Sequence, residues 1–167
     1  MKSTCPYCEK FREIEIVKKM EKNIIHGIEI ESEAEFSLCT VCGKDFATMD
    51  QMGFSLTNGY NTYRKLENII FPEEIISIRG KYGINQKTFA KILELEESAF
   101  KCYEQGTLAS KAVSDLIRLM ELPEKFTEMF EKNKYKLSPS QIRKIENTLT
   151  KQSTTFPKNV LIKIQEY

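Results

Sequence analysis

Four cysteines in two closely spaced pairs constrain the fold of this chain more than any other feature. The first pair is Cys5 and Cys8, the second is Cys39 and Cys42, and two residues separate the cysteines within each pair. Such a turn aims both sulfurs at one point, so two turns can close a tetrahedron of thiolates around a metal ion. Soft sulfur donors in that geometry favour zinc. The pattern therefore predicts one structural Zn²⁺ per chain.

The residue after each pair affects how its turn closes. Gly43 follows the second pair and can adopt a left-handed conformation without steric cost, whereas Glu9 follows the first pair. A single pair would also fit a redox dithiol, and four cysteines in a secreted protein would fit two disulfides. The repeated spacing favours metal ligation over both alternatives.

The thirty residues between the pairs have the period-two pattern of half-buried strands. Isoleucines alternate with glutamates around Ile14 and again around Ile28, and polar residues 18–23 are expected to connect the two strands. A shorter strand through Phe36 then leads to Cys39. His26 is predicted to be a strand or turn residue and not a metal ligand. We expect a β domain over residues 1–47 whose folding free energy comes largely from the metal.

Composition limits the class of protein. The chain has 167 residues, 41% of them hydrophobic, which is enough for a packed core. Its apolar stretches are too short to cross a bilayer and it begins without the pattern of a signal peptide, so we expect a cytoplasmic protein with no membrane partner. Charge is balanced overall, but residues 122–167 carry nine Lys and Arg against five Asp and Glu. This C-terminal region is the basic part of the chain.

Helical spacing replaces strand spacing from Pro72 onward. Helices are predicted over residues 72–82, from the N-cap Asn85, over residues 97–105 and from residue 110, with Pro123 at the next boundary. Two more amphipathic helices are expected at residues 124–133 and from residue 139. The segment 46–66 is predicted to be a linker helix. Its apolar stripe favours packing against the core or a second copy, with partner binding as the alternative, and the stripe contains Met49, Met52, Phe54, Leu56, Tyr60 and Tyr63.

Two short helices joined by a tight turn describe a helix-turn-helix, whose second helix enters the DNA major groove. The residues resemble the Cro and lambda-repressor type of DNA-binding domain over about fifty residues. The positions that carry this resemblance are Arg79, Gln86, Phe89, Ala90, Leu93, Phe100 and Tyr103 to Gly106. The resemblance implies that Arg79 pairs with Glu104 and that Gln86 contacts a DNA phosphate. The predicted DNA-binding residues are Asn85, Gln86, Lys87, Ser98, Lys101 and Cys102.

Two of these positions depart from the family pattern. Cys102 stands where family members usually carry a base-reading arginine, and Ser98 replaces a polar amide. Neither side chain can make the bidentate arginine contact to guanine. Three glutamates, Glu94, Glu96 and Glu97, precede or begin the second helix and would repel phosphate. Sequence-specific operator binding is the favoured prediction, and weak DNA binding or a helix-turn-helix used only for dimerisation are the alternatives. Cys102 is expected to be an inert thiol, with redox sensing as its alternative.

Together the cysteine pairs and the helix-turn-helix resemble the YgiT-type zinc-finger/helix-turn-helix antitoxins, the MqsA-like family, over residues 1–122. This resemblance implies that the metal-bound N-terminal domain neutralises a cognate toxin, while the helical domain dimerises and represses its own operon at its promoter. A stand-alone zinc-containing regulator, for example of a mobile element, is the alternative. Catalysis is not expected, because four cysteine ligands leave no open metal position and a single histidine forms no nucleophile-base pair.

The sequence as a whole predicts an α+β chain. Its four parts are a zinc-binding β domain at residues 1–47, a connector at 48–71, an all-α lambda-repressor-like domain at 72–122 and a helical extension at 123–167. Residues 153–157 are expected to break the last helix, and an apolar end follows from Val160 to Ile164. The extension is equally consistent with packing on the helical domain, dimerisation, partner binding or DNA binding.

Overall fold

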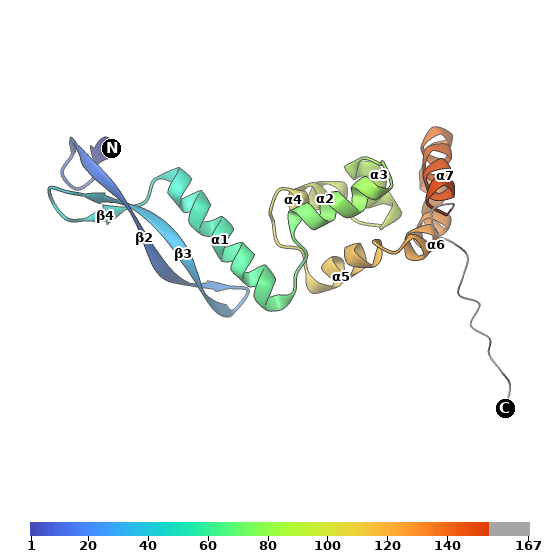
Figure 1. The fold of residues 1–167 in the computed structure, drawn as a ribbon, viewed down its shortest axis with the longest axis horizontal. Helices are drawn as coiled ribbons and strands as arrows, with labels where there is room; N and C mark the ends of the chain where they lie inside the picture. Colours follow the sequence, from blue (N-terminus) through green and yellow to red (C-terminus); the bar gives the residue numbers. More distant parts are fainter. Residues whose placement is uncertain (154–167) are drawn as a thin grey trace, which may run out of the picture. The chain divides into compact units, whose positions relative to one another are not determined.

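The computed structural model describes residues 1–153 and has an α+β fold, as predicted (Figure 1). In this part of the chain, an antiparallel sheet with the strand order β1-β2-β3-β4 precedes seven α-helices and one 3-10 turn. The elements are β1 (Lys2–Cys5), β2 (Lys10–Ile25), β3 (Ile28–Cys39), β4 (Asp45–Phe46), α1 (Met49–Glu67), α2 (Pro72–Lys81), α3 (Gln86–Ile92), α4 (Glu97–Glu104), α5 (Lys111–Leu119), α6 (Pro123–Asn133), η1 (Lys134–Lys136) and α7 (Pro139–Ser153).

Contacts divide the chain into two compact units. The sheet unit contains Met1–Pro72 together with Gln105–Asp115, and the helical unit contains Glu73–Glu104 together with the described residues that follow Asp115. The four-part division expected from the sequence stays a prediction. The predicted break up to Pro157 and the apolar end from Val160 lie outside the described residues.

Strands β2 and β3 form one long hairpin, in continuous register from Ile14 opposite Cys39 to Ile25 opposite Ile28. The predicted hairpin is therefore confirmed, but the prediction that residues 18–23 connect its strands is wrong, because they belong to β2. The chain reverses at His26 and Gly27, with φ values of 50° and 83°. A two-residue turn with both φ values positive matches the twist of the flanking strands, so pairing continues up to the turn.

Helix α1 packs on β3 along one face of the hairpin (Figure 1). Ser32 and Ala34 of β3 are buried beneath it, and a Cβ atom added to Gly59 of α1 would lie 3.4 Å from Ile25 Cδ1. These small residues allow the helix to approach the sheet closely. Thr48 caps the helix through a capping box with Gln51, which fixes where the helix begins.

The apolar stripe of α1 is only partly covered. Tyr63 is buried, but 82% of the Met49 surface is exposed, and Met52 and Leu56 are also exposed. Phe54 is exposed as well, so these four residues do not pack into the core, and packing of the stripe against a second copy stays a prediction. The residues that α1 buries are instead Gln51, Gly59, Tyr63 and Arg64.

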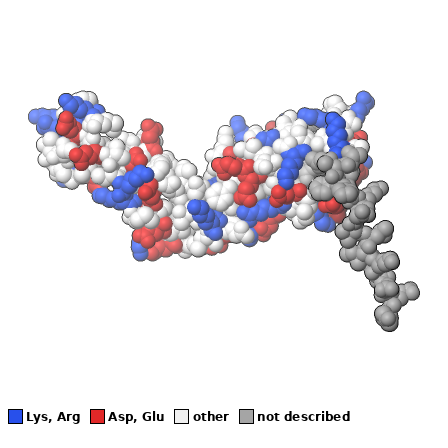
Figure 2. All heavy atoms as spheres, in the orientation of Figure 1, with Lys and Arg blue, Asp and Glu red and all other residues white. Residues whose placement is uncertain are grey.

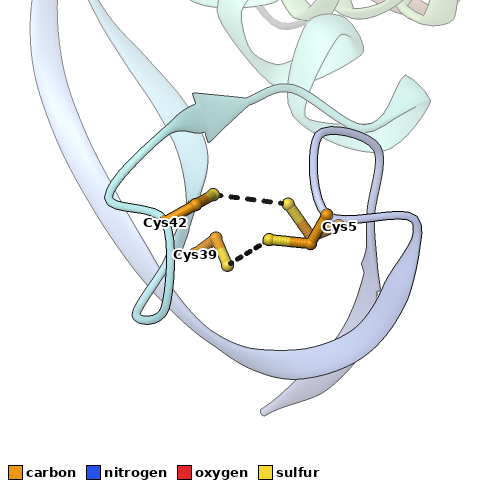
Figure 3. Close-up of side chains that lie close together, drawn as sticks. Cys5, Cys39 and Cys42 are labelled. Carbon is orange, nitrogen blue, oxygen red and sulfur yellow. Dashed lines mark hydrogen bonds between the residues drawn. The ribbon is translucent and has the colours of Figure 1, made fainter.

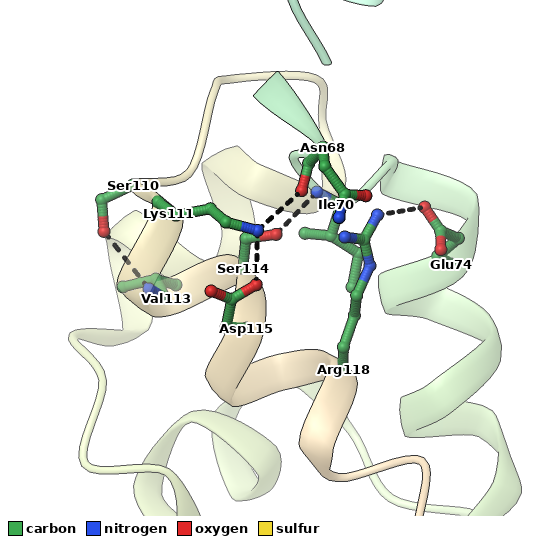
Figure 4. Close-up of polar contacts among 9 residues, drawn as sticks. All are labelled: Asn68, Ile70, Glu74, Ser110, Lys111, Val113, Ser114, Asp115 and Arg118. Carbon is green, nitrogen blue, oxygen red and sulfur yellow. Dashed lines mark hydrogen bonds and ion pairs between the residues drawn. The ribbon is translucent and has the colours of Figure 1, made fainter. Parts of the chain in front are cut away.

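A polar network closes the sheet unit at the end of α1 (Figure 4). Asn68 adopts a left-handed conformation as the C-cap, and its carbonyl accepts a hydrogen bond from Lys111 Nζ at 3.2 Å. The Ile70 backbone N–H donates to the buried Ser114 Oγ at 2.7 Å. Arg64 Nη2 donates to the carbonyl of Gly106 at 2.6 Å. These bonds hold the segment that follows α4 against the end of α1.

Aromatic rings form the core of the helical unit. Tyr82 stacks on Phe126 with a centroid distance of 3.5 Å, and Phe89 contacts both Phe100 and Phe126. The predicted inward residues Tyr82, Phe89, Ala90, Leu93 and Phe100 are buried, and Tyr103 is half-buried. Phe126, Phe130 and Ile145 complete the core, so the predicted helical extension packs on the helical unit through α6 and α7.

The Tyr82 hydroxyl provides a test of this core. It donates to the Met120 carbonyl at 2.6 Å, and desolvation by burial raises its pKa to about 12. Replacing Tyr82 with Phe leaves that carbonyl without this donor and should lower the free energy of unfolding by about 1 kcal/mol at pH 7. As pH rises from about 10 towards the folded-state pKa, wild-type protein should lose more stability than Tyr82→Phe, because the variant lacks this titrating group. The difference in unfolding free energy between the two proteins should therefore be smaller at pH 11 than at pH 7.

Urea unfolding followed by far-ultraviolet circular dichroism at the two pH values measures this deficit. Tyr135→Phe is the control, because Tyr135 is 76% exposed. A deficit that stays the same at pH 7 and pH 11 would contradict the assigned environment of Tyr82.

Candidate metal centre and nucleic-acid interface

The two cysteine pairs form turns of matching geometry. In the first turn, the Glu9 backbone N–H donates to the Cys5 carbonyl at 2.9 Å, and in the second the Gly43 N–H donates to the Cys39 carbonyl, also at 2.9 Å. Glu9 and Gly43 both lie in the left-handed region, at φ values of 53° and 68°. Gly43 therefore adopts the predicted conformation, and Glu9 adopts it despite its side chain.

Strand β2 brings the two turns together. Its first residue, Lys10, pairs with Cys5 at the end of β1, and Ile14 pairs with Cys39 at the end of β3. The thirty residues between the cysteine pairs therefore form one hairpin that begins and ends at the cysteines. The buried Ile14 side chain packs with Cys5 and Cys39 beside the cluster.

The four sulfurs lie at distances suited to one metal ion (Figure 3). All four Sγ atoms lie within 4.8 Å of one another, with Cys5 to Cys42 at 3.7 Å and Cys8 to Cys39 at 4.0 Å. A tetrahedral site with metal–sulfur bonds of about 2.3 Å has sulfur–sulfur edges of about 3.8 Å. All five cysteines of the chain are free, which excludes the disulfide alternative for this structure. The cluster therefore fits a tetrahedral metal ion once its longer sulfur–sulfur separations shorten by up to about 1 Å.

The surroundings of the cluster lower the pKa of one cysteine and raise that of another. Hydrogen bonding from the Cys42 backbone lowers the pKa of Cys39 to about 6. The neighbouring Cys42 thiol and desolvation raise the pKa of Cys8 to about 12. Close thiols resist ionising together because their negative charges repel. A cation at the centre would stabilise the four-thiolate state.

In the helical unit, Arg79 and Glu104 form a bidentate ion pair between α2 and α4. Arg79 Nε and Nη2 lie 2.6 Å and 3.0 Å from the two carboxylate oxygens, and Arg79 Nη1 also donates to the Ile84 carbonyl at 2.8 Å. Gln86 Nε2 donates to the same Glu104 carboxylate at 2.6 Å. Gln86 therefore makes a hydrogen bond within the protein, whereas the resemblance implies that its side chain contacts a DNA phosphate.

The other predicted DNA-binding residues fall into two groups. Asn85 caps α3 by accepting the Thr88 N–H at 2.9 Å, Lys87 pairs with Glu97 at 3.2 Å, and the Ser98 hydroxyl donates to Glu96. The structure thus places all six predicted residues on α3, on α4 or at their caps. Asn85, Gln86, Lys87 and Ser98 contact other residues of the helical unit, whereas Lys101 and Cys102 are exposed on α4.

Each glutamate near the start of α4 has an intramolecular partner. Glu94 has a φ of 57° in the turn after α3 and accepts from Lys136 at 2.7 Å and Lys132 at 3.2 Å. These two lysines lower the pKa of the Glu94 carboxyl. Glu96 caps α4 by accepting the Ala99 N–H at 3.0 Å, and Glu97 pairs with Lys87 as above. The negative charge expected to oppose phosphate is therefore partly offset.

Sequence reasoning missed the contribution of Lys132 and Lys136 to this turn. The signal was the excess of basic residues beyond residue 122, but the sequence did not indicate which acidic residue they reach.

Figure 2 shows basic and acidic side chains interspersed on the visible face of the helical unit, without a broad surface of one sign. None of the helices in residues 1–153 is long and apolar enough to span a membrane.

Comparison with known proteins identifies the family. The family model described as the antitoxin component of bacterial toxin-antitoxin system, MqsA, matches residues 3–134, which include the four clustered cysteines and helices α1 to α6. Searches of the curated proteins and of the solved structures found no match. The family model covers more than half of the chain and confirms the resemblance noted in the sequence. The chain belongs to the MqsA antitoxin family.

Proposed function

We propose that this chain is a zinc-containing antitoxin whose sheet unit neutralises a cognate toxin and whose helical unit represses its own operon. The observation that carries the proposal is the presence of a closed four-sulfur cluster and a helix-turn-helix arrangement in one chain of an antitoxin family. Zinc suits four cysteine sulfurs in a tetrahedron. Because such a sphere leaves no open position for substrate or water, the metal acts on structure and not on catalysis.

The sheet unit is the part that suits toxin binding. Twelve of the sixteen large apolar side chains exposed in the described chain belong to this unit, including Met20, Ile24, Met49 and Met52. Exposed apolar groups gathered in one unit are typical of a surface that a protein partner covers. Metal ligation would hold the strands that carry this surface in a fixed arrangement.

The helical unit is the part that suits operator binding in the cytoplasm, as a homodimer on the protein's own promoter. Helix α3, the turn at Glu94 and helix α4 follow the order of a helix-turn-helix, with α4 in the position of the recognition helix. Lys101 is exposed on α4 and suits a phosphate contact. Cys102 and Ser98 supply no bidentate base contact, so specificity would come from other base contacts and from DNA shape.

The toxin-antitoxin assignment predicts a neighbouring gene for a small toxin. Expression of that gene's product alone should arrest growth, and co-expression of this chain should restore it. The matched control is co-expression of the chain with Cys39 replaced by Ser, which removes one metal ligand and should restore growth poorly. The absence of any neighbouring gene whose product this chain counteracts would instead favour the stand-alone regulator.

The DNA-binding assignment predicts a preference for the protein's own promoter. A gel shift should detect binding to promoter DNA at concentrations at least about 10³-fold lower than for unrelated DNA of equal length. Lys101→Ala should weaken binding to both DNAs by a similar factor and reduce the dependence of affinity on salt by about one phosphate contact.

Lys125→Ala is the control for that experiment, because Lys125 is an exposed lysine of α6 that pairs with Glu128. Equal affinity of the wild-type chain for promoter and unrelated DNA at every salt concentration would refute operator recognition.

A further inference from the structure

In the described part of the chain, most of the outer edge of β2 has no strand beside it. Strand β1 pairs only with Lys10 to Glu13 of β2, and Met1 bonds to Ile14. Strand β3 lies along the other edge of β2. Within residues 1–153, no strand therefore pairs with the outer edge from Glu15 to Ile25. An unpaired edge of this length is a ready template for another strand.

The register shows which backbone groups this edge presents. Ile14 directs both its N–H and its carbonyl outward, since the N–H donates to the Met1 carbonyl at 2.7 Å and its own carbonyl accepts from the Met1 amine at 3.2 Å. Pairing between β2 and β3 continues without a bulge to the hairpin turn. In an antiparallel ladder, the backbone N–H and carbonyl groups of successive residues point alternately to the two edges of the strand. The outward set, hereafter the even residues, is Ile16, Lys18, Met20, Lys22 and Ile24.

Apolar side chains border this edge on both faces of the sheet. Among the even residues, Ile16, Met20 and Ile24 are exposed by 45%, 60% and 76%. On the face that carries α1, a groove of about 850 Å³ lies between the sheet and the helix. Its lining includes Met52 and Leu56, two of the uncovered apolar residues of α1. A strand from a partner placed at this edge would cover exposed apolar side chains of this chain on both faces of the sheet.

Charge indicates the kind of partner. Residues 13–36, which make up the hairpin arm, carry seven glutamates and three lysines, a net charge of −4. Lys18 pairs with Glu33 and Lys22 with Glu29 within the arm. A second copy of the chain docked edge to edge would bring two arms of −4 together, which disfavours self-association. A basic partner would be attracted.

We propose that the outer edge of β2 binds the toxin by accepting an extended apolar segment of that basic protein as an additional strand, with one row of its side chains in the groove. This inference rests on the proposed antitoxin function. The even residues would supply main-chain hydrogen bonds, and the exposed apolar side chains on either face would supply the buried area. The acidic arm would steer the basic partner to the edge.

Amide hydrogen exchange resolved by residue tests the proposal directly. The probe is the product of the neighbouring gene, mixed with the full-length metal-bound chain. In the free chain, the N–H groups of the even residues should exchange quickly, while the alternate residues that bond to β3 exchange slowly. In the complex, exchange at the even residues should slow by at least about tenfold, because each N–H gains a strand partner.

Two matched pairs of variants measure the contribution of the edge and of the groove. Met20→Pro removes an outward N–H while leaving the bonds between β2 and β3, and should weaken toxin binding at least about tenfold more than Met20→Ala. Leu56→Glu places a charge in the groove and should weaken binding at least about tenfold, whereas Leu66→Glu should not. Leu56 and Leu66 are both exposed residues of α1, at 54% and 60%, and only Leu56 lines the groove. Metal content and circular dichroism verify that each variant is folded.

The outcomes separate this inference from the proposed function. A complex that forms while the even residues exchange as in the free chain would overturn the edge proposal and leave the antitoxin assignment standing. Protection of the even residues that rises with the concentration of the free chain alone would show an interface between copies, and would also overturn it. Failure of the neighbouring gene's product to bind the wild-type chain would contradict both.

Discussion

The meeting of four sulfurs at one point is the constraint on which the sheet unit depends. Cys5 and Cys39 end two strands that are not neighbours, and both are fully buried beside Ile14. Strand β2 lies between them, so the cluster joins β1 to β3 across it. Beyond this point the sheet is a two-stranded hairpin with one helix, an arrangement with little apolar burial of its own. A metal ion here would compensate for that small core.

The helical unit depends on different interactions. Its aromatic core is closed by residues of the C-terminal extension, and its polar contacts centre on two carboxylates. Glu104 joins α2, α3 and α4 through Arg79 and Gln86. Glu94 joins the helix-turn-helix turn to α6 and η1 through two lysines. Residues at the expected DNA surface thus also stabilise the fold, so substitutions at Asn85 or Gln86 would change stability as well as binding.

Features set by local chemistry could be predicted from the sequence. The cysteine spacing led to the metal cluster, and proline, cap and periodicity signals placed the helices from α2 onward within a residue or two of the bounds predicted for them. Helix α1 begins three residues later than predicted, because Phe46 belongs to β4 and Thr48 caps the helix. The hairpin was found from its alternation, but its connection was misplaced. Residues 18–23 are mostly polar, because one face of a two-stranded arm is open to solvent. A polar stretch of this kind resembles a loop in sequence, so it is predicted as the connection. The turn itself uses His26 in a left-handed conformation, which is uncommon for residues other than glycine, although histidine adopts it more often than most.

Features set by long-range packing could not be predicted. Exposure of Met49 and Leu56 depends on how α1 lies across the sheet, since helix periodicity does not distinguish a buried stripe from an uncovered one. The partners of Gln86, Lys87 and Glu94 likewise depend on which distant side chains reach them. The excess of lysines in the extension was visible, but its pairing with Glu94 follows from the packing of α6 against α3.

The most direct test of this account measures the metal and its ligands in the purified full-length chain. Elemental analysis should find one zinc per chain, and X-ray absorption at the zinc edge should find four sulfur neighbours at about 2.3 Å. Cys39→Ser should lose the metal and unfold the sheet unit, whereas Cys102→Ser, which changes the exposed cysteine of α4, should retain both. A sheet unit that stays folded after chelation, or a zinc site with nitrogen or oxygen ligands, would contradict the central role assigned to the four thiolates.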